Sequence, residues 1–244
     1  MKILDDLVSK LNFQASVRDI RQGPFHTGVV TRNCGLASTL LKDAFWQEGH
    51  PFVQEPGFLL NKSTQELVQL AYSESVLEAA IGMATINSLI DVDEERCVAL
   101  NAHNLIAEKG EGKKVAIVGH FPFIPKLREV VKKLWVIEKN PSDGDFTELE
   151  AEDIIPQADV VGITGTAFTN HTIEHLLELC NNKAYVVILG DTTPLSPILF
   201  DCGVNALSGT KVIDADLALR CVSQGATFRQ IKGVRLLTMK KDRS

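Results

Sequence analysis

The sequence predicts an α/β protein in which a Rossmann-like, doubly wound parallel sheet follows a small α+β domain. Short apolar runs, such as VAIVG at 115–119 and AYVVIL at 184–189, alternate with segments that carry apolar residues at helical spacing. These runs are apolar throughout, which is typical of parallel strands covered on both faces. The residues before about 111 follow a different pattern. We therefore predict two domains, at 1–110 and 111–244.

The C-terminal domain is expected to alternate strands and helices along its whole length. Gly119, Gly165 and Gly190 directly follow three of the apolar runs, and Asn140-Pro141 ends a fourth. Crossovers between parallel strands are almost always right-handed, so the carboxyl ends of these strands meet at one edge. After the strand at 115–119, the predicted elements are a helix with apolar residues at 124, 127, 130 and 131, a strand within 134–141, a strand at 159–164, a helix from Thr169 onward, the strand at 184–189, a short helix at 198–203, a strand within 204–214 and a helix at 214–224.

The N-terminal domain is expected to hold a small antiparallel sheet followed by helices. Gly23-Pro24 is a clear turn signal between two strand-like segments. Ser75 precedes Glu78 by three residues, as in a capping box at the start of a helix. The predicted elements are an amphipathic helix at 3–11, a strand, turn and strand within 13–32, either a strand or a helix start at 35–43, and helices at 63–70 and 75–90.

Composition and charge exclude several classes of protein. The 244 residues carry a net charge of -6 and no long basic run, which argues against nucleic acid as a partner; the short basic tail at 239–244 is expected to fray. No apolar run is long enough to span a membrane, and a start with Asp5 and Asp6 lacks a signal-peptide core. The five cysteines are widely spaced without a C-x-x-C pair, which predicts reduced thiols in a cytoplasmic protein.

Residues 171–175, His-Thr-Ile-Glu-His, match the H-x-x-E-H signature of one class of zinc protease. On a continuous helix with about 100° between successive residues, Ile173 and Leu176 would cover the sheet and both histidines would face solvent. A catalytic zinc site instead needs a cleft and a third protein ligand. We therefore interpret the segment as the polar face of a helix. The alternative is an incidental or interfacial metal site.

Polar loops follow four of the predicted strands and would lie together at the carboxyl edge of the sheet, where ligands bind in such folds. The first loop lacks the G-x-G-x-x-G pattern, which argues against ordinary NAD or FAD binding. Glu138 lies 19 residues after Gly119, where an acid takes ribose hydroxyls in nucleotide-binding sheets; a bond to Lys139 or a capping role is the alternative. The loop at 164–170 suits an anion at a helix N-terminus, or it simply caps the helix. The candidate ligand-binding residues of these loops are Gly119, His120, Phe121, Glu138, Asn140, Thr164, Gly165, Thr166, Thr169, Asn170, Asp191, Thr192 and Thr193.

Four stretches of the C-terminal domain, VGHFPF, VIEKNP, ITGTAFTN and GDTTPLSPILFDCGV, in this order resemble the putative heavy-metal chelation family. The stretches GPFHTGVVTR and GLAST resemble the small domain that precedes it, so the similarity spans nearly the whole chain. The resemblance implies an enolase N-terminal-like domain packed on a Rossmann-like domain, with a site in the cleft between them. The family's name refers to metal handling or an unusual cofactor pathway, not to an established reaction. The implied site positions are Glu138, Asn140, Thr164, Gly165, Thr166, Asp191 and Thr193 on the Rossmann-like side and Thr31, Asn33 and Gly35 on the other.

The sequence leaves two hypotheses for the function open. In the first, an enzyme or ligand-handling protein holds a small polar, nucleotide-like or phosphorylated ligand between its domains, with His120, Asp191 or His26 as general acid or base. In the second, the protein binds a divalent or heavy metal without catalysis, through ligands drawn from Cys34, His120, Glu138, Asp191 and His26. A homodimer is compatible with both, and a structural subunit without a ligand is the third alternative.

Overall fold

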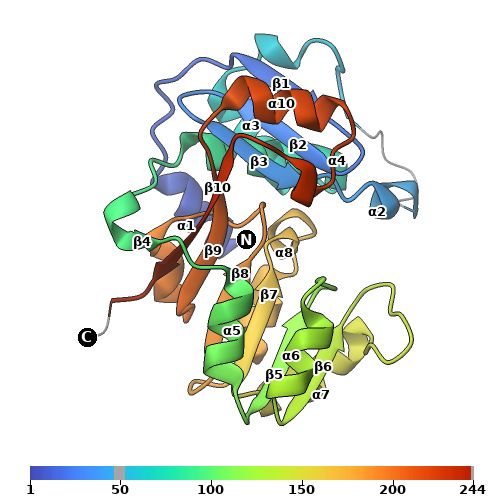
Figure 1. The fold of residues 1–244 in the computed structure, drawn as a ribbon. Helices are drawn as coiled ribbons and strands as arrows, with labels where there is room; N and C mark the ends of the chain where they lie inside the picture. Colours follow the sequence, from blue (N-terminus) through green and yellow to red (C-terminus); the bar gives the residue numbers. More distant parts are fainter. Residues whose placement is uncertain (47–52, 243–244) are drawn as a thin grey trace.

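The computed structural model describes residues 1–46 and 53–242, and the strands of these residues form two separate sheets (Figure 1). In spatial order, the large sheet consists of β4 (Cys97–Val98), β10 (Val234–Lys240), β9 (Ala206–Val212), β8 (Tyr185–Leu189), β7 (Val160–Thr164), β5 (Lys114–Val118) and β6 (Lys133–Ile137). The small sheet consists of β1 (Asp19–Gln22), β2 (His26–Val30) and β3 (Cys34–Ser38). We call each sheet with the helices packed on it the large lobe and the small lobe.

The large sheet is mostly parallel. Strands β9, β8, β7, β5 and β6 run in one direction, and β10 is antiparallel to both β9 and β4. Successive residues of a strand point to opposite faces, so Val115 and Ile117 pack in one core cluster and Ala116 packs in the other. Because both faces are buried, these strands need apolar residues at nearly every position. The predicted mixed α/β class with a mostly parallel sheet is confirmed.

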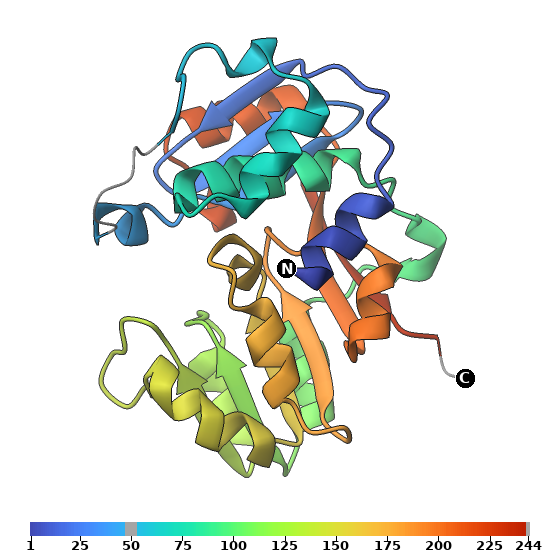
Figure 2. The same cartoon turned by 180° about the vertical axis from the view of Figure 1, so that it is seen from behind.

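Helices cover both faces of the large sheet (Figures 1 and 2). One face packs against α5 (Ala102–Gly110) and α6 (Ile124–Val130). The opposite face packs against α1 (Lys2–Ser9), α7 (Ala151–Ile154), α9 (Ile173–Leu179) and the 3₁₀ helices η5 (Ile155–Gln157) and η6 (Pro197–Cys202). None of the helices formed by the described residues is long and apolar enough to cross a membrane.

The small sheet is also covered on both faces. Helix α4 (Val76–Leu89) packs on one face and α10 (Ala215–Ser223) on the other, and Figures 1 and 2 show the sheet between them. All five residues of β2 are therefore buried, and in α4 every residue except Asn87 is buried. Ser75 caps α4 by accepting a hydrogen bond from Glu78 N. The remaining elements of this part are α2 (Leu41–Trp46), η1 (Leu59–Asn61), α3 (Thr64–Gln69), which begins with a capping box of Ser63 and Glu66, and η2 (Leu70–Tyr72).

A helix near each end of the described chain packs on the lobe whose sheet lies farther from it in the sequence. Helix α10 follows β9 of the large sheet but packs on β1 and β2 of the small sheet. Helix α1 precedes the small sheet but packs against η6 of the large lobe, and Ile3 N donates a 2.6 Å hydrogen bond to Glu174 Oε1 in α9. Several chain segments therefore connect the two lobes, and neither lobe is one continuous stretch of sequence.

The continuous helix predicted from Thr169 onward is wrong. Helix α8 (Thr166–Thr169) ends there, and His171 has a left-handed backbone with φ of 61° before α9 begins at Ile173. Asn170 Oδ1 accepts hydrogen bonds from both the amide and the hydroxyl of Thr172, which gives the chain a local alternative to helical bonds. The break moves His171 off the helix face that the sequence pattern assigned to it.

The prediction that residues 239–244 fray is wrong for Met239 and Lys240. Met239 and Lys240 belong to β10, where Met239 is fully buried and pairs with Leu207 of β9. No strand was predicted at 234–240, where two basic residues interrupt the apolar pattern that marks the parallel strands. Antiparallel pairing to β9 and β4 supplies the partners that make this segment a strand.

Candidate functional site

The order of the parallel strands reverses at β5. The chain passes from β5 to β6 on one side of it and then continues with β7 on the other side. The loops after β5 and β7 therefore diverge and open a crevice at the carboxyl ends of the strands, where ligands bind in open α/β sheets. Two cavities lie at this point, and Phe121 after β5 and Thr164 at the end of β7 line both of them.

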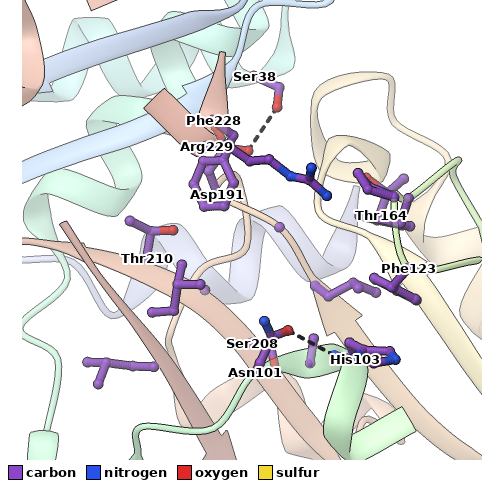
Figure 3. A pocket seen from close by; sticks show the side chains of 18 of the residues that line it. Ser38, Asn101, His103, Phe123, Thr164, Asp191, Ser208, Thr210, Phe228 and Arg229 are labelled. Carbon is purple, nitrogen blue, oxygen red and sulfur yellow. Dashed lines mark hydrogen bonds between the residues drawn. The ribbon is translucent and has the colours of Figure 1, made fainter. Parts of the chain in front are cut away.

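The larger cavity lies between the lobes and has a volume of about 710 Å³ (Figure 3). This volume falls within the range of about 300–1,000 Å³ that is typical of small-molecule sites. His26 and Ser38 line it from the small sheet, and Arg229 lines it from η7 (Phe228–Gln230), which packs beside α10. Asp191 and Lys126 line it from the large lobe. Both lobes are thus required to form this cavity.

A polar triplet of buried His26, buried Asp191 and half-buried Ser38 joins the lobes at one wall of the large cavity. His26 Nδ1 lies 2.5 Å from Asp191 Oδ2. Ser38 Oγ donates a 2.8 Å hydrogen bond to Asp191 Oδ1, which Figure 3 shows as a dashed line. Both His26 and Asp191 are only 6–7% exposed. The Asp191 carboxylate therefore has two side-chain partners from a different sheet, and it holds the His26 ring in one orientation.

The loop that carries Asp191 is anchored to the small lobe by its neighbours. Gly190 follows β8 with φ of 118°, a conformation that glycine adopts without strain. Thr192 Oγ1 accepts a 2.9 Å hydrogen bond from Ser38 N, and Asn87 Nδ2 donates to Thr192 O at 3.1 Å. The backbone turn and these bonds place Asp191 directly opposite His26.

The environment of Asp191 favours its charged form. Burial by itself raises the pKa of the Asp191 carboxyl, but the hydrogen bond and charge of His26 and the hydrogen bond of Ser38 outweigh this, and the pKa lies below its ordinary value. The carboxylate is therefore ionised at neutral pH. It accepts from Nδ1 of His26, which leaves Nε2 as the ring nitrogen available to a ligand.

The large cavity is positively charged. Of its charged lining residues, Lys126 and Arg229 are cations with no hydrogen bond or ion pair to any part of the chain that the structure describes, and Asp191 is the acid. Figure 3 shows the Arg229 side chain extending across the cavity toward Thr164. Because Asp191 already has His26 and Ser38 as partners, the two free cations are left to attract an anion.

Aromatic side chains form an apolar wall in the same cavity. The rings of Phe121 and Phe123 are stacked with their centroids 5.2 Å apart. The ring centroids of His103 and Phe123 are 5.3 Å apart. On the small-lobe side, the ring centroids of Phe228 and His26 are 6.0 Å apart. Such rings offer flat apolar surface to a planar part of a ligand, next to the charged groups that fix its orientation.

The smaller cavity has a volume of about 440 Å³ and lies beside the end of β6. Glu138, the predicted ribose-binding acid, lines it and accepts hydrogen bonds from His120 N at 2.6 Å and Lys139 N at 3.1 Å. The His120 ring bonds through Nδ1 to Asp145 Oδ2 at 3.0 Å. Glu138 thus shapes the loop after β5, and each of its oxygens has one backbone donor.

The sequence-predicted site residues are divided between the two cavities and other places. Asp191, His26, Phe121 and Thr164 line the large cavity. Gly119, His120, Phe121, Glu138, Asn140, Thr164, Thr166 and Asn170 line the small one. Thr31, Asn33, Cys34, Gly35, Gly165, Thr169, Thr192 and Thr193 line neither cavity.

The positions implied by the resemblance in the small domain have structural partners. Thr31 Oγ1 hydrogen-bonds to Ser88 in α4, and Asn33 Nδ2 donates to Asp91 Oδ1 at 3.1 Å. Gly35 lies so close to α4 that a Cβ atom there would be 2.1 Å from Ala84 O. These residues thus attach the small sheet to α4 at the end of β3 opposite to Ser38.

Several lining residues of the large cavity were not identified from the sequence. Ser38 and Lys126 lie in predicted elements and carry no pattern that marks them as functional. Phe228 and Arg229 lie in 225–233, a segment with no predicted helix or strand. A search for cations near the ends of predicted elements would have included Lys126, but only packing of α10 on the small sheet brings Arg229 to the cavity.

The predicted metal ligands do not form one cluster. Among the residues that the structure describes, no group of three or more His, Cys, Asp or Glu side chains is placed to hold a metal ion. Cys34 is buried with Val30 and Leu219 in the small lobe. The H-x-x-E-H segment is also divided, because His171 Nε2 bonds to Ala71 O at 2.9 Å while His175 lies on α9 near Glu152.

We expect Cys34 to resist alkylation by iodoacetamide at pH 8 in the native protein. Burial raises the pKa of its thiol to about 12, and the nearby Asp19 carboxylate adds to this effect. The thiol therefore stays protonated, and the thiolate is the nucleophilic form. Peptide mapping by mass spectrometry measures labelling before and after unfolding in guanidinium chloride. Labelling of Cys34 at equal rates in both states would contradict this description of its environment.

Comparison with known proteins gives the same architecture. A crystal structure of a DUF364-family protein of unknown function from Desulfitobacterium hafniense DCB-2 has a TM-score of 0.87 and 27% identity over 98% of both chains. A DUF364-family protein from Pyrococcus horikoshii shares the fold, with a TM-score of 0.83 and 23% identity over 98% of this chain and 100% of its own. An uncharacterized protein from Methanocaldococcus jannaschii is 28% identical over 206 residues, which are 82% of this chain and 78% of the relative.

The family models cover both lobes. The DUF4213 model, described as putative heavy-metal chelation, matches residues 4–90. The DUF364 model, with the same description, matches residues 101–241, which is more than half of the chain. The protein therefore belongs to the DUF364 family, whose description is putative heavy-metal chelation.

Proposed function

We propose that the protein binds a small anionic molecule in the large cavity between its lobes and transfers a proton to or from it through His26. The observation that carries this proposal is the buried pair of His26 and Asp191, whose Nδ1 and Oδ2 atoms lie 2.5 Å apart. The same cavity is lined by two cations without a partner among the described residues. A carboxylate on Nδ1 fixes the tautomer and the orientation of a histidine ring and leaves Nε2 for a ligand. Lys126 and Arg229 would hold the anion within reach of that nitrogen.

The expected ligand carries a phosphate or carboxylate and a flat apolar part. The cations favour phosphate or carboxylate oxygens, and a guanidinium such as that of Arg229 binds them through two parallel hydrogen bonds. The stacked Phe121 and Phe123 rings lie in the same cavity and suit a planar group. A nucleotide-like or phosphorylated molecule meets both conditions.

We also propose the finer fold assignment that the resemblance implies. The parallel strands have the order β6-β5-β7-β8-β9, which is the 2-1-3-4-5 order of doubly wound folds of the flavodoxin type, a Rossmann-like arrangement. The small lobe would be the enolase N-terminal-like domain, and the site would lie in the cleft between the two. The predicted boundary at residue 110 separates the two sheets only approximately, because β4 and α5 precede it in the large lobe and α10 follows it in the small lobe.

Heavy-metal chelation, the role in the family description, fits the side chains less well. Of the five candidate ligands, His26 and Asp191 line the large cavity, His120 and Glu138 line the small one, and Cys34 is buried in the small lobe. The described residues contain no group of three suitable side chains. The pKa of Cys34 is raised to about 12, whereas soft metals are bound by thiolates. We therefore favour anion binding over chelation, and metal analysis of protein purified without a histidine tag distinguishes the two.

A ligand screen tests the proposed anion site. We expect pyrophosphate or AMP, but not cationic S-adenosylmethionine, to raise the melting temperature. Arg229→Ala and Lys126→Ala should each weaken binding of pyrophosphate about tenfold, because a hydrogen bond to a charged group contributes about 1.5–3 kcal/mol. Isothermal titration calorimetry measures the dissociation constants.

Arg128→Ala is the matched control for this screen. Arg128 lies on α6 near Lys126, is exposed and does not line the cavity, so its removal changes the net charge equally but should leave binding unchanged. If no anion stabilises the protein, or if all three variants weaken binding to the same extent, the large cavity is not the anion site.

A further inference from the structure

We propose that the small cavity beside β6 is a second binding site, for an uncharged hydroxylated molecule of the nucleoside or sugar class. It is separate from the large cavity, and the inference goes beyond the proposed anion site because it assigns a second ligand to the protein. The two cavities share only Phe121 and Thr164 among their described lining residues, so they adjoin at these two residues.

The charge of the small cavity is opposite to that of the large one. Its charged lining residues are the acids Asp43, Glu138 and Glu148 together with Lys139, and His120 and His175 also line it. Lys139 Nζ lies 3.5 Å from Asp43 Oδ2, so this cation already has a partner. An anion would therefore meet unbalanced carboxylates here, whereas hydroxyl groups would meet acceptors.

Glu138 is oriented to accept hydrogen bonds from a ligand. Its two oxygens accept one backbone hydrogen bond each, from His120 N and Lys139 N, and these bonds fix the direction of the carboxylate. A carboxylate has about four acceptor positions, so positions remain for the hydroxyl groups of a ligand. The cavity lies at the exit of β6, and the half-buried Glu138 lines it.

Amide and hydroxyl groups of neighbouring loops supply further polar contacts. The side chain of Asn140 has no hydrogen-bond partner among the described residues. Asn170 uses its Oδ1 to cap Thr172, which leaves the Nδ2 donor available. An amide can accept a hydroxyl hydrogen and donate to a hydroxyl oxygen, which is the combination that a polyol requires.

The floor of the small cavity is apolar. Val118 and Ile137 line it from the ends of β5 and β6, and Leu176 lines it from α9. The CH groups of a sugar ring or the face of a base can lie on such a floor, while the hydroxyls turn toward Glu138. The volume of about 440 Å³ is within the range of about 300–1,000 Å³ for small-molecule sites.

Titration of the wild-type protein with adenosine and with pyrophosphate tests the second site. We expect adenosine to bind wild type and Arg229→Ala equally, and to bind Glu138→Gln about tenfold more weakly. Pyrophosphate should show the reverse pattern, with a loss in Arg229→Ala and none in Glu138→Gln. Glu129→Gln, an exposed change on α6 outside both cavities, is the matched control.

A second variant keeps the test decisive if Glu138→Gln disturbs the loop after β5. Asn140→Ala removes only an exposed amide without a partner, so it should leave the melting temperature unchanged and weaken adenosine binding about threefold. The inference is overturned if adenosine at millimolar concentration does not bind, or if Arg229→Ala weakens it while Glu138→Gln and Asn140→Ala do not. In either case, pyrophosphate binding that depends on Arg229 would leave the proposed function intact.

Discussion

Replacing Asp191 with alanine is expected to lower the free energy of unfolding by about 3 kcal/mol, because each buried donor left without an acceptor costs about 1–3 kcal/mol. The change removes the acceptor of both His26 Nδ1 and Ser38 Oγ, which lie 2.5 Å and 2.8 Å from the carboxylate. These partners come from the small lobe, so the loss also loosens the contact between the lobes. Urea unfolding followed by circular dichroism measures the difference.

Two further variants separate the causes of this loss. Asp153→Ala removes an exposed carboxylate of α7 and should change stability by less than about 0.5 kcal/mol. Asp191→Asn keeps one acceptor oxygen and should recover part of the loss. If Asp191→Ala were as stable as Asp153→Ala, the triplet of His26, Asp191 and Ser38 would not contribute to the contact between the lobes.

The same carboxylate gives stability a defined dependence on pH. The pKa of Asp191 is lower in the folded protein than its ordinary value, so its contribution is fully present above the unfolded pKa of about 3.9. The contribution is lost as the pH falls from there through the folded pKa. Wild type should therefore lose more stability than Asp191→Asn between about pH 5 and pH 2.

Replacing Gly35 with alanine is expected to lower the free energy of unfolding by about 3 kcal/mol or more, because overpacking against fixed backbone forces elements apart. A Cβ atom at Gly35 would lie 2.1 Å from Ala84 O and 2.4 Å from Ser88 N. Both atoms belong to the backbone of α4, which is buried along nearly its whole length and has no space to move. Denaturant unfolding and the yield of folded protein measure the effect.

Gly57→Ala serves as the control for Gly35→Ala. Gly57 has φ of 91° and no atom near an added Cβ, so alanine there costs backbone strain of about 1–2 kcal/mol without a steric contact. A larger effect at Gly35 than at Gly57 would show that the close approach of β3 and α4 is responsible. Equal effects at the two positions would contradict the packing that places β3 on α4.

Local patterns predicted much of the architecture. The runs at 115–119 and 184–189 are apolar at every position, and the structure explains this because helices cover both faces of β5 and β8. Gly23-Pro24 marked the turn between β1 and β2, and the cap at Ser75 marked the start of α4. These features depend on a few adjacent residues, so they are visible in sequence.

Other features depend on residues that are distant along the chain. Segment 234–240 becomes β10 because β9 and β4 lie on either side of it, not because of its own pattern. The helix predicted from Thr169 breaks at His171, where the side chain bonds to Ala71, one hundred residues earlier. Short-range propensity is too weak to resist such tertiary interactions.

In the candidate site, too, some residues were predicted from local patterns and others were placed only by tertiary packing. The sequence placed Glu138 and Thr164 at the carboxyl ends of parallel strands, since strand direction and crossover handedness follow general rules. It named His26 and Asp191 as alternatives for the general acid or base and as members of one candidate set of metal ligands, but it did not predict that they hydrogen-bond to each other. It did not identify Arg229, because a single basic residue in an irregular segment carries no pattern.

By itself, the sequence determined that this is an α/β protein with buried parallel strands and polar loops at their carboxyl ends, because burial on two faces and turn geometry act on neighbouring residues. Only the tertiary structure decided that α10 returns to the small sheet, that His26 meets Asp191, and that the loops divide into two cavities of opposite charge. Those outcomes depend on how two separate sheets pack against each other, and that packing is a property of the whole chain.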